Sequence, residues 1–381
     1  MRLSVPHMGN LYIAFKSLFE QLGVDYVLPP ASSRRTLTLG AKYSPEGLCI
    51  PFKLTTGNII EAAELGADTI LMPGGTAICR LGYYADAQEK ILQEIGFNNV
   101  RIINVGVSGG KLSGFFSTIK RLSNNASWLD IIAAFRFAVR KTSAIDEAER
   151  AVFKTRPREL EKGSANKIYD AAVKAIDAAK NDKELTAARR HFKAQFEAVP
   201  RDPKADPIVV NVMGEFFVVL DPFSNFDVEN ELGKLGVEVR RTLYISDWLQ
   251  LSYFFNPFAH AQTKRLHRAA LPYVKRDIGG EGWESVGEKV YHHDKLDGLI
   301  HLGPFTCMPE IIASNILPTT REKLPVLDIW CDEQMAKAGL VTRLEAFVDL
   351  LARQRRTKYN NSIKKHEIRI SKSEKNSKIP T

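Results

Sequence analysis

The chain has 381 residues, of which 44% are hydrophobic and 25% are charged, and its formal net charge is +9. This composition is typical of a globular protein with about two domains, and it excludes a collagen-like or fully disordered chain. Residues 353–381 carry ten Lys and Arg and two Asp and Glu, a net +8, so by difference residues 1–352 carry only +1. We therefore expect no specific nucleic-acid surface on the folded part of the chain.

The sequence lacks the patterns of membrane and secreted proteins. Its longest apolar stretch, residues 207–220, is interrupted by polar residues and is too short to span a bilayer. Met1 is not followed by the basic and apolar regions of a secretory signal. We expect a cytoplasmic protein that does not bind membranes.

The first part of the chain predicts strands that alternate with helices. The expected strands are residues 3–5, 24–28, 69–72 and 100–105, and the expected helices are residues 11–22, a segment ending at 59–65, and 85–95. A glycine follows each of these helices, which is a common way for a helix to end. Strands and helices at this short spacing indicate a doubly wound parallel sheet.

The middle of the chain changes character. Residues 128–199 are rich in Ala, Lys, Glu and Arg, have almost no glycine and contain no strand-like run, so we expect a helical insert. A proline-rich linker at 200–207 ends it. A second α/β region follows, with strands expected at 208–212, 237–240, 298–302 and 326–329.

The two α/β regions resemble each other. Met-Gly precedes Asn10 in the first region and Glu215 in the second, and a later strand in each is followed by a Gly/Pro loop with a cysteine, Cys79 or Cys307. This similarity favours two related lobes that face a shared cleft. We predict a first lobe at 1–127, a helical connector and linker at 128–207, a second lobe at 208–352 and a basic disordered tail at 353–381.

Three of the four cysteines occupy the same kind of position. Cys49, Cys79 and Cys307 each lie in a loop directly before an expected helix. The positive end of a helix favours the thiolate, and ligands of open α/β sheets bind beyond the carboxyl ends of the strands. Thiolates that converge from two lobes suit an iron–sulfur cluster or zinc, whereas simple burial is the alternative. We expect Cys331 to pack or to lie near the site, and the alternative is a role as a fourth ligand.

Several motifs resemble those of a known family. The first lobe contains PHMGN (6–10), YSPEGLCIPFK (43–53) and CRLGYY (79–84), and the second contains DPFSNF (221–226), YVKRDIGG (273–280), PFTCMPE (304–310) and DEQ (332–334). With them the chain resembles the 2-hydroxyacyl-CoA dehydratase superfamily, and within it the acyl-CoA dehydratase activase-related branch, whose relatives include the double-cubane cluster proteins. A departure is Met-Ala-Lys-Ala-Gly at 335–339, where relatives carry Thr-Gly-Glu-Ala-Gly.

The resemblance implies two flavodoxin-like lobes and a 4Fe-4S cluster, as one cubane or two, with Cys49, Cys79 and Cys307 as ligands. It implies an oxygen-sensitive protein of anaerobic metabolism that receives a low-potential electron from an ATP-hydrolysing activase. That electron would serve radical dehydration or reduction of an acyl-CoA or another small molecule, as in a dehydratase-like lyase or a reductase component. It also implies a homodimer, or a heterodimer with a related subunit.

Two residues beside the cysteines are candidate catalytic groups. Glu46 would be an acid/base or a group that orients the ligands, and the alternative is an ordinary loop carboxylate. Arg80 would hold an anionic substrate group or lower a thiol pKa, and the alternative is a surface salt bridge. For His7 and His301 we expect internal hydrogen bonds. The run Gly-Val-Ser-Gly-Gly-Lys at 106–111 lacks P-loop spacing, so we expect the partner to hydrolyse ATP.

Two other functions fit the same residues. The chain could be a non-catalytic iron–sulfur electron carrier or activase-associated partner that never binds CoA. It could also be a zinc-binding structural protein. Iron and sulfide analysis separates the second of these from the iron–sulfur enzyme, and a thioester-dependent spectral change separates the first.

Overall fold

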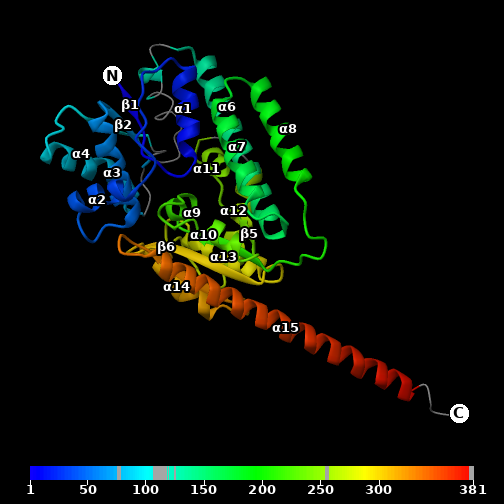
Figure 1. Ribbon diagram of the computed structural model, residues 1–381. Coiled ribbons are helices and arrows are strands. Elements are labelled where there is room, and N and C mark those ends of the chain that lie inside the picture. The colour runs from blue at the N-terminus through cyan, green and yellow to red at the C-terminus, as the bar shows by residue number, and fades with distance from the viewer. Residues whose placement is uncertain (75–78, 106–117, 119, 124–125, 254–256, 377–381) are drawn as a thin grey trace.

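A computed structural model describes residues 1–381 except 75–78, 106–117, 119, 124–125, 254–256 and 377–381 (Figure 1). Side chains at 250–253, 257–260 and 358–376 are likewise outside the description.

The first lobe is built on a parallel sheet that, within the described residues, has the order β1-β2-β3. Its elements are β1 (Leu3–Ser4), α1 (Leu11–Gln21), α2 (Arg34–Tyr43), α3 (Ile50–Glu64), β2 (Thr69–Met72), η1 (Arg80–Tyr83), α4 (Tyr84–Glu94) and β3 (Arg101–Asn104). The expected strand at 24–28 is reduced to one parallel bridge, between Tyr26 and Leu3. All four residues of β2 are buried, as expected of a central strand with helices on both faces.

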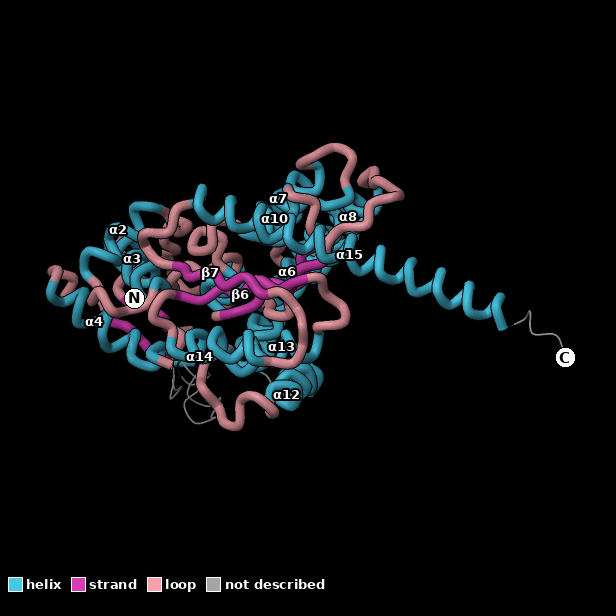
Figure 2. The backbone as a smooth tube through the Cα atoms, turned by 90° about the horizontal axis from the view of Figure 1, so that it is seen from below, coloured by secondary structure: helices cyan, strands magenta, loops and turns pink. Residues whose placement is uncertain are grey.

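The second lobe has a parallel sheet with the order β5-β4-β6-β7 within the described residues. Its strands are β4 (Val209–Gly214), β5 (Glu238–Arg241), β6 (Gly298–Pro304) and β7 (Val326–Cys331). Its helices are α9 (Phe216–Leu220), α10 (Val228–Lys234), α11 (Ile245–Tyr253), α12 (Pro257–Ala270), α13 (Gly282–His292), α14 (Met308–Ile316) and η4 (Leu317–Thr319). Figure 2 shows α13 and α14 on one side of β6 and β7, and α10 and α15 on the other.

Both lobes have the same strand order. If the Tyr26 bridge is counted as the second strand of the first lobe, the order of the strands across that sheet is second, first, third, fourth. The order β5-β4-β6-β7 in the second lobe is the same when its strands are counted along the chain. This is the flavodoxin-like order, in which the direction of strand addition along the sheet reverses between the first and third strands, and a ligand crevice forms at that point. The prediction of two flavodoxin-like lobes is confirmed.

The expected helical insert forms between the lobes. It consists of α6 (Trp128–Thr155), η3 (Arg156–Arg158), α7 (Ser164–Ala178) and α8 (Asp182–Ala198). Helix α6 packs against α1 of the first lobe and against α11 and β5 of the second (Figure 1). Buried Glu149 on α6 accepts a hydrogen bond from Asn10 (3.3 Å) and pairs with buried Arg241 on β5. The insert therefore joins the two lobes.

The C-terminal segment differs from the expectation. Helix α15 spans Lys337–Asn376 and runs away from the two lobes (Figure 1). The prediction of a disordered tail is therefore wrong for the backbone of residues 353–376. The reason is local propensity: no glycine or proline occurs between 340 and 379, and Lys, Arg, Glu and Gln are good helix formers. No helix in the described part of the chain has the length and apolar character of a membrane span.

Candidate functional site

The three cysteines of interest line one cavity of about 210 Å³. Each directly precedes a helix, as expected: Cys49 caps α3, Cys79 caps η1 and Cys307 caps α14. Cys49 and Cys307 are each 7% exposed, and Cys79 is half-buried. Two sulfur atoms thus come from the first lobe and one from the second.

The cavity lies where the carboxyl ends of the strands from both lobes meet. Val5 follows β1, Pro73 follows β2, Glu215 follows β4, and Pro304 is the last residue of β6. This is the edge at which open α/β sheets bind their ligands. The shared cleft that the sequence predicts is therefore present.

The residues around the cavity occupy paired places in the two lobes. Cys79 and Cys307 both follow the third strand of their sheet, β2 or β6. Cys49 caps α3, the helix that leads to β2, and Glu281 caps α13, the helix that leads to β6. All four line the cavity. The second lobe therefore offers a carboxyl group where the first lobe offers a thiol.

The thiols are protonated in the cavity at neutral pH. Burial raises the pKa of Cys49, Cys79 and Cys307, and the nearby carboxyl group of Glu215 raises each of them further. Cys49 Sγ also lies 2.7 Å from the hydroxyl oxygen of Tyr84. The expectation that the helix ends alone would favour the thiolates is wrong, because the cost of burying the charge exceeds their effect.

Two half-buried carboxyl groups on the cavity wall, those of Glu215 and Glu281, were not identified from the sequence. Burial raises the pKa of Glu215 to about 7, despite hydrogen bonds from the backbone of Phe217 and Val218. Burial, and then the charge of Glu215, raise the pKa of Glu281 well above its usual value. Groups with such pKa values can hold and release a proton near neutral pH. The only indication of Glu215 in the sequence was the similarity of Gly214-Glu215 to Gly9-Asn10 in the first lobe.

Arg80 connects the loops that carry the cysteines. Its Nη1 donates to the carbonyl oxygen of Gly47 (2.9 Å), and its Nη2 donates to the carbonyl oxygen (2.5 Å) and the hydroxyl (3.1 Å) of Thr306. Gly47 lies two residues before Cys49, and Thr306 directly precedes Cys307. The geometry therefore supports a positioning role for Arg80, and its expected contact with a substrate stays a prediction.

Glu46 lies outside the residues that line the cavity. It is exposed, and its carbonyl oxygen accepts a hydrogen bond from Lys53 Nζ (3.2 Å). Lys53 is buried and forms an ion pair of 2.6 Å with Glu333 of the second lobe. The acid/base role of Glu46 stays a prediction, while Glu215 and Glu281 are carboxyl groups that face the cavity.

The remaining candidates have mostly structural surroundings. His301 is buried, and its ring nitrogens contact Glu310 (2.7 Å) and Asp328 (2.6 Å), which confirms the expected internal hydrogen bonds. His7 lines the cavity, and burial lowers its pKa. Cys331 is buried at the end of β7, as expected. The loop at 106–111 lies outside the described residues.

No described group of three or more His, Cys, Asp or Glu side chains stands close enough to hold a metal ion as it is now arranged. Cys49, Cys79 and Cys307 line one cavity without forming such a group.

One comparison with known proteins gave a match. Residues 5–80 match the CoA enzyme activase uncharacterised domain (DUF2229). The matched region contains Cys49, Cys79, Glu46 and Arg80, and it ends before the second lobe. No curated protein matches the chain. Over residues 5–80 the first lobe is thus similar to this CoA enzyme activase domain.

Proposed function

We propose that the chain is an iron–sulfur protein of the 2-hydroxyacyl-CoA dehydratase-like class, with Cys49, Cys79 and Cys307 as the cluster ligands. The observation that carries this proposal is the meeting of three thiols, far apart in the sequence, at one cavity between two lobes of the same topology. The CoA enzyme activase-related match over residues 5–80 supports it for the first two ligands.

The donor set fits a cluster better than a single ion. A zinc ion binds thiolates at about 2.3 Å, so its ligands crowd around one point. A cluster distributes its thiolates over separate iron atoms. Cys49, Cys79 and Cys307 cap three different helices at the cavity, which suits a cluster. Cationic iron would also remove the cost that raises the thiol pKa values, because a coordinated thiol is deprotonated.

When bound, such a cluster would accept a low-potential electron from an ATP-hydrolysing activase and transfer it to an acyl-CoA or another small substrate for dehydration or reduction. The protein residues have separate tasks. Glu215, with a pKa raised to about 7, can hold and release a proton at the cavity wall near neutral pH, and burial raises the pKa of Glu281 beside it. Arg80 holds two of the cysteine loops together.

Much of the cavity wall is apolar. Apolar side chains from both lobes line it: Val5, Met8, Leu11, Phe15, Leu71, Met72, Phe216, Phe217 and Trp248. In such surroundings a charge interacts more strongly with its neighbours than it does in water. A site of this kind suits reactive, water-sensitive intermediates.

The test is metal analysis of protein purified without oxygen. We expect iron and acid-labile sulfide in comparable amounts, and an EPR signal after reduction with dithionite. Cys307→Ala should lose most of the iron. Cys331→Ala is the matched control, because Cys331 is also buried but does not line the cavity; it should keep the iron.

Three results would contradict the proposal in different ways. A colourless protein with one zinc and no sulfide would favour the structural zinc site. Equal iron in the two cysteine variants would remove Cys307 from the ligand set. A cluster whose spectrum never changes with acyl-CoA thioesters would favour an electron carrier over an enzyme.

A further inference from the structure

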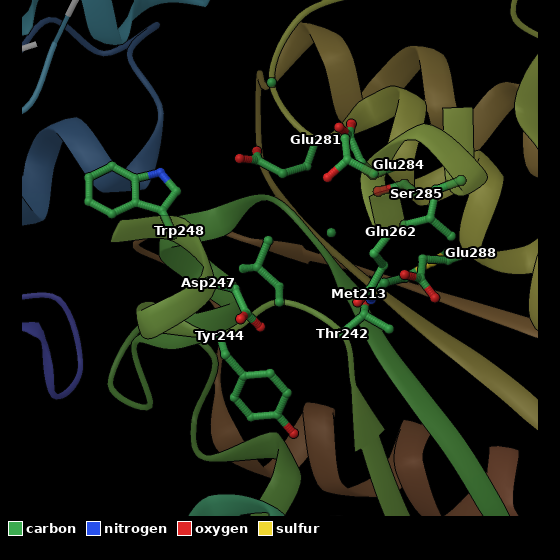
Figure 3. A pocket seen from close by; sticks show the side chains of 15 residues that line it. Met213, Thr242, Tyr244, Asp247, Trp248, Gln262, Glu281, Glu284, Ser285 and Glu288 are labelled. Atoms are coloured by element: carbon green, nitrogen blue, oxygen red, sulfur yellow. The ribbon is translucent and has the colours of Figure 1, made fainter. Parts of the chain in front are cut away.

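A second cavity, of about 310 Å³, lies in the second lobe beside the cysteine cavity. The two cavities share part of their walls, namely Trp248, Gly280 and Glu281. Side chains from the ends of β4 and β5 and from α11, α12 and α13 surround the second one (Figure 3). We call it the acidic cavity. Its volume is at the small end of the range for sites that hold small molecules.

Four carboxyl groups line the acidic cavity, those of Asp247, Glu281, Glu284 and Glu288 (Figure 3). Among its described lining residues there is no Lys, Arg or His. Two of these four carboxyl groups pair with basic side chains that lie outside the cavity lining.

Asp247 lies 3.7 Å from Arg150, and Glu284 lies 2.6 Å from His267 Nε2. The hydrogen bond from His267 to Glu284 raises the pKa of His267, so this histidine carries positive charge more readily than usual. Glu281 accepts a hydrogen bond from the backbone N–H of Phe216 (3.4 Å), so Glu288 is the carboxyl group that most needs a partner.

Glu288 gives a second, independent indication of a missing partner. The residue is 2% exposed, and its Oε2 accepts a hydrogen bond from Asn211 Nδ2 (3.1 Å). Its Oε1 is buried and has no partner with hydrogen-bond geometry, although Thr242 lies close enough to favour the anion. Buried polar atoms are normally paired, so this oxygen indicates a donor that is supplied from outside.

The nearest histidine does not supply the missing charge. His292 Nε2 lies 3.6 Å from Glu288 Oε2, but burial lowers the pKa of His292, so its ring is mainly neutral at pH 7. Burial also raises the pKa of Glu288 to about 7. A bound cation would reverse that effect.

The rest of the wall suits an organic cation rather than a metal ion. Met213, Leu266 and the ring of Trp248 add apolar surface, and aromatic rings also attract ammonium groups. No three carboxyl groups among the described residues stand close enough for a metal ion. A small organic molecule can place a charged nitrogen at Glu288 and still cover this apolar wall.

We propose that the acidic cavity binds a small organic ammonium ion, with its nitrogen at Glu288 Oε1 and its apolar part against Met213 and Leu266. The site adjoins the cysteine cavity through Glu281, so its ligand would lie next to the proposed cluster. The inference does not depend on the cluster, because none of the three cysteines lines the acidic cavity.

The test is titration calorimetry with benzylammonium and with benzyl alcohol, which has nearly the same shape but no charge. At pH 7 we expect benzylammonium to bind at least tenfold more tightly than the alcohol. Binding should release protons, because the cation lowers the raised pKa of Glu288. Titrations in buffers with different ionisation enthalpies measure that release.

Glu288→Gln keeps the shape of the side chain and should weaken benzylammonium at least tenfold while leaving benzyl alcohol unchanged. Glu94→Gln is the control, because Glu94 is exposed at the end of α4; it should bind as the wild type does. Equal affinity for the two ligands, binding of neither, unchanged binding by Glu288→Gln, or displacement of benzylammonium by millimolar Mg²⁺ would each overturn the proposal. The comparison of the two ligands on the wild type needs no variant, so it stands even where Glu288→Gln fails to fold.

Discussion

Replacing Arg80 by alanine removes the three hydrogen bonds that join the loops before Cys49 and Cys307. A hydrogen bond to a charged group contributes about 1.5–3 kcal/mol when buried. Arg80 is half-buried, and water can replace it at the exposed carbonyl group of Gly47. We therefore expect Arg80→Ala to lower the free energy of unfolding by about 2 kcal/mol, rather than by the sum of three buried bonds.

The backbone of Thr306 adds a local reason for that loss. Its φ is +71°, a left-handed conformation that a β-branched residue rarely adopts. Such a conformation costs on the order of 1–3 kcal/mol and persists only where the surroundings enforce it. Arg80 contacts both the carbonyl group and the hydroxyl of Thr306, so its removal should allow this residue, and Cys307 after it, to relax.

The assay is urea unfolding of matched variants, followed by the tryptophan fluorescence. Arg80→Lys should lose nearly as much stability as Arg80→Ala, because an ammonium group is a compact donor that cannot reach both loops. Arg34→Ala is the control, since Arg34 is exposed at the start of α2, and it should change stability by less than about 0.5 kcal/mol. Identical midpoints for Arg80→Ala and the wild type would refute the reasoning and show that other contacts hold the loops.

Three further outcomes can be measured in the same way. Gly214→Ala should cost more than about 3 kcal/mol, since its Cβ would lie 1.9 Å from the carbonyl oxygen of Leu302, whereas Gly236→Ala meets no atom within 4 Å and should cost about 1 kcal/mol; equal losses would contradict this. Burial raises the pKa of Glu288 from 4.5 to about 7, so the folded state holds a proton that the unfolded state has released, and stability falls as the pH rises through this range. Glu288→Gln should make that fall shallower by up to about 1.4 kcal/mol per pH unit, and an unchanged slope between pH 5 and 7 would be evidence against the assigned group. A chain that ends at Thr357 should keep the wild-type urea midpoint and lose helical circular dichroism, and an unaltered spectrum would show that the removed segment is not helical in solution.

The fold was largely predictable because local signals agree with tertiary structure. Strands β2, β4 and β6 are short runs of buried apolar residues, which the sequence shows directly. The helices end where glycine permits a left-handed backbone, as at Gly23 (φ +61°) and Gly66 (φ +92°). The positions of Cys79 and Cys307 after strands then follow from the topology.

Helix α2 was not predicted, because it packs through small residues rather than an apolar stripe. A Cβ at Gly40 would lie 1.6 Å from the carbonyl oxygen of Lys53, and one at Gly57 would lie 2.0 Å from that of Thr36. The backbones of α2 and α3 therefore approach closely where both helices carry glycine. Sequence periodicity counts large apolar residues and does not detect such a contact.

The cavity carboxyl groups were not predictable for a different reason. Glu215 and Glu281 are single acidic residues without a spacing motif, and only the fold brings them beside Cys49, Cys79 and Cys307. Their raised pKa values come from burial, which a sequence does not report. By contrast, Glu46 and Arg80 were noticed because they adjoin cysteines in sequence.

The division of the cysteines between the lobes makes their geometry depend on how the lobes are held. Cys49 and Cys79 belong to the first lobe and Cys307 to the second, so a rotation of one lobe against the other would move Cys307 relative to both. The hydrogen bond from Arg80 to Thr306 and the Lys53–Glu333 ion pair connect the two lobes and hold them in position. An inorganic centre bound to all three sulfur atoms would link the two lobes. Its loss should therefore increase the motion of the lobes relative to each other rather than unfold either of them.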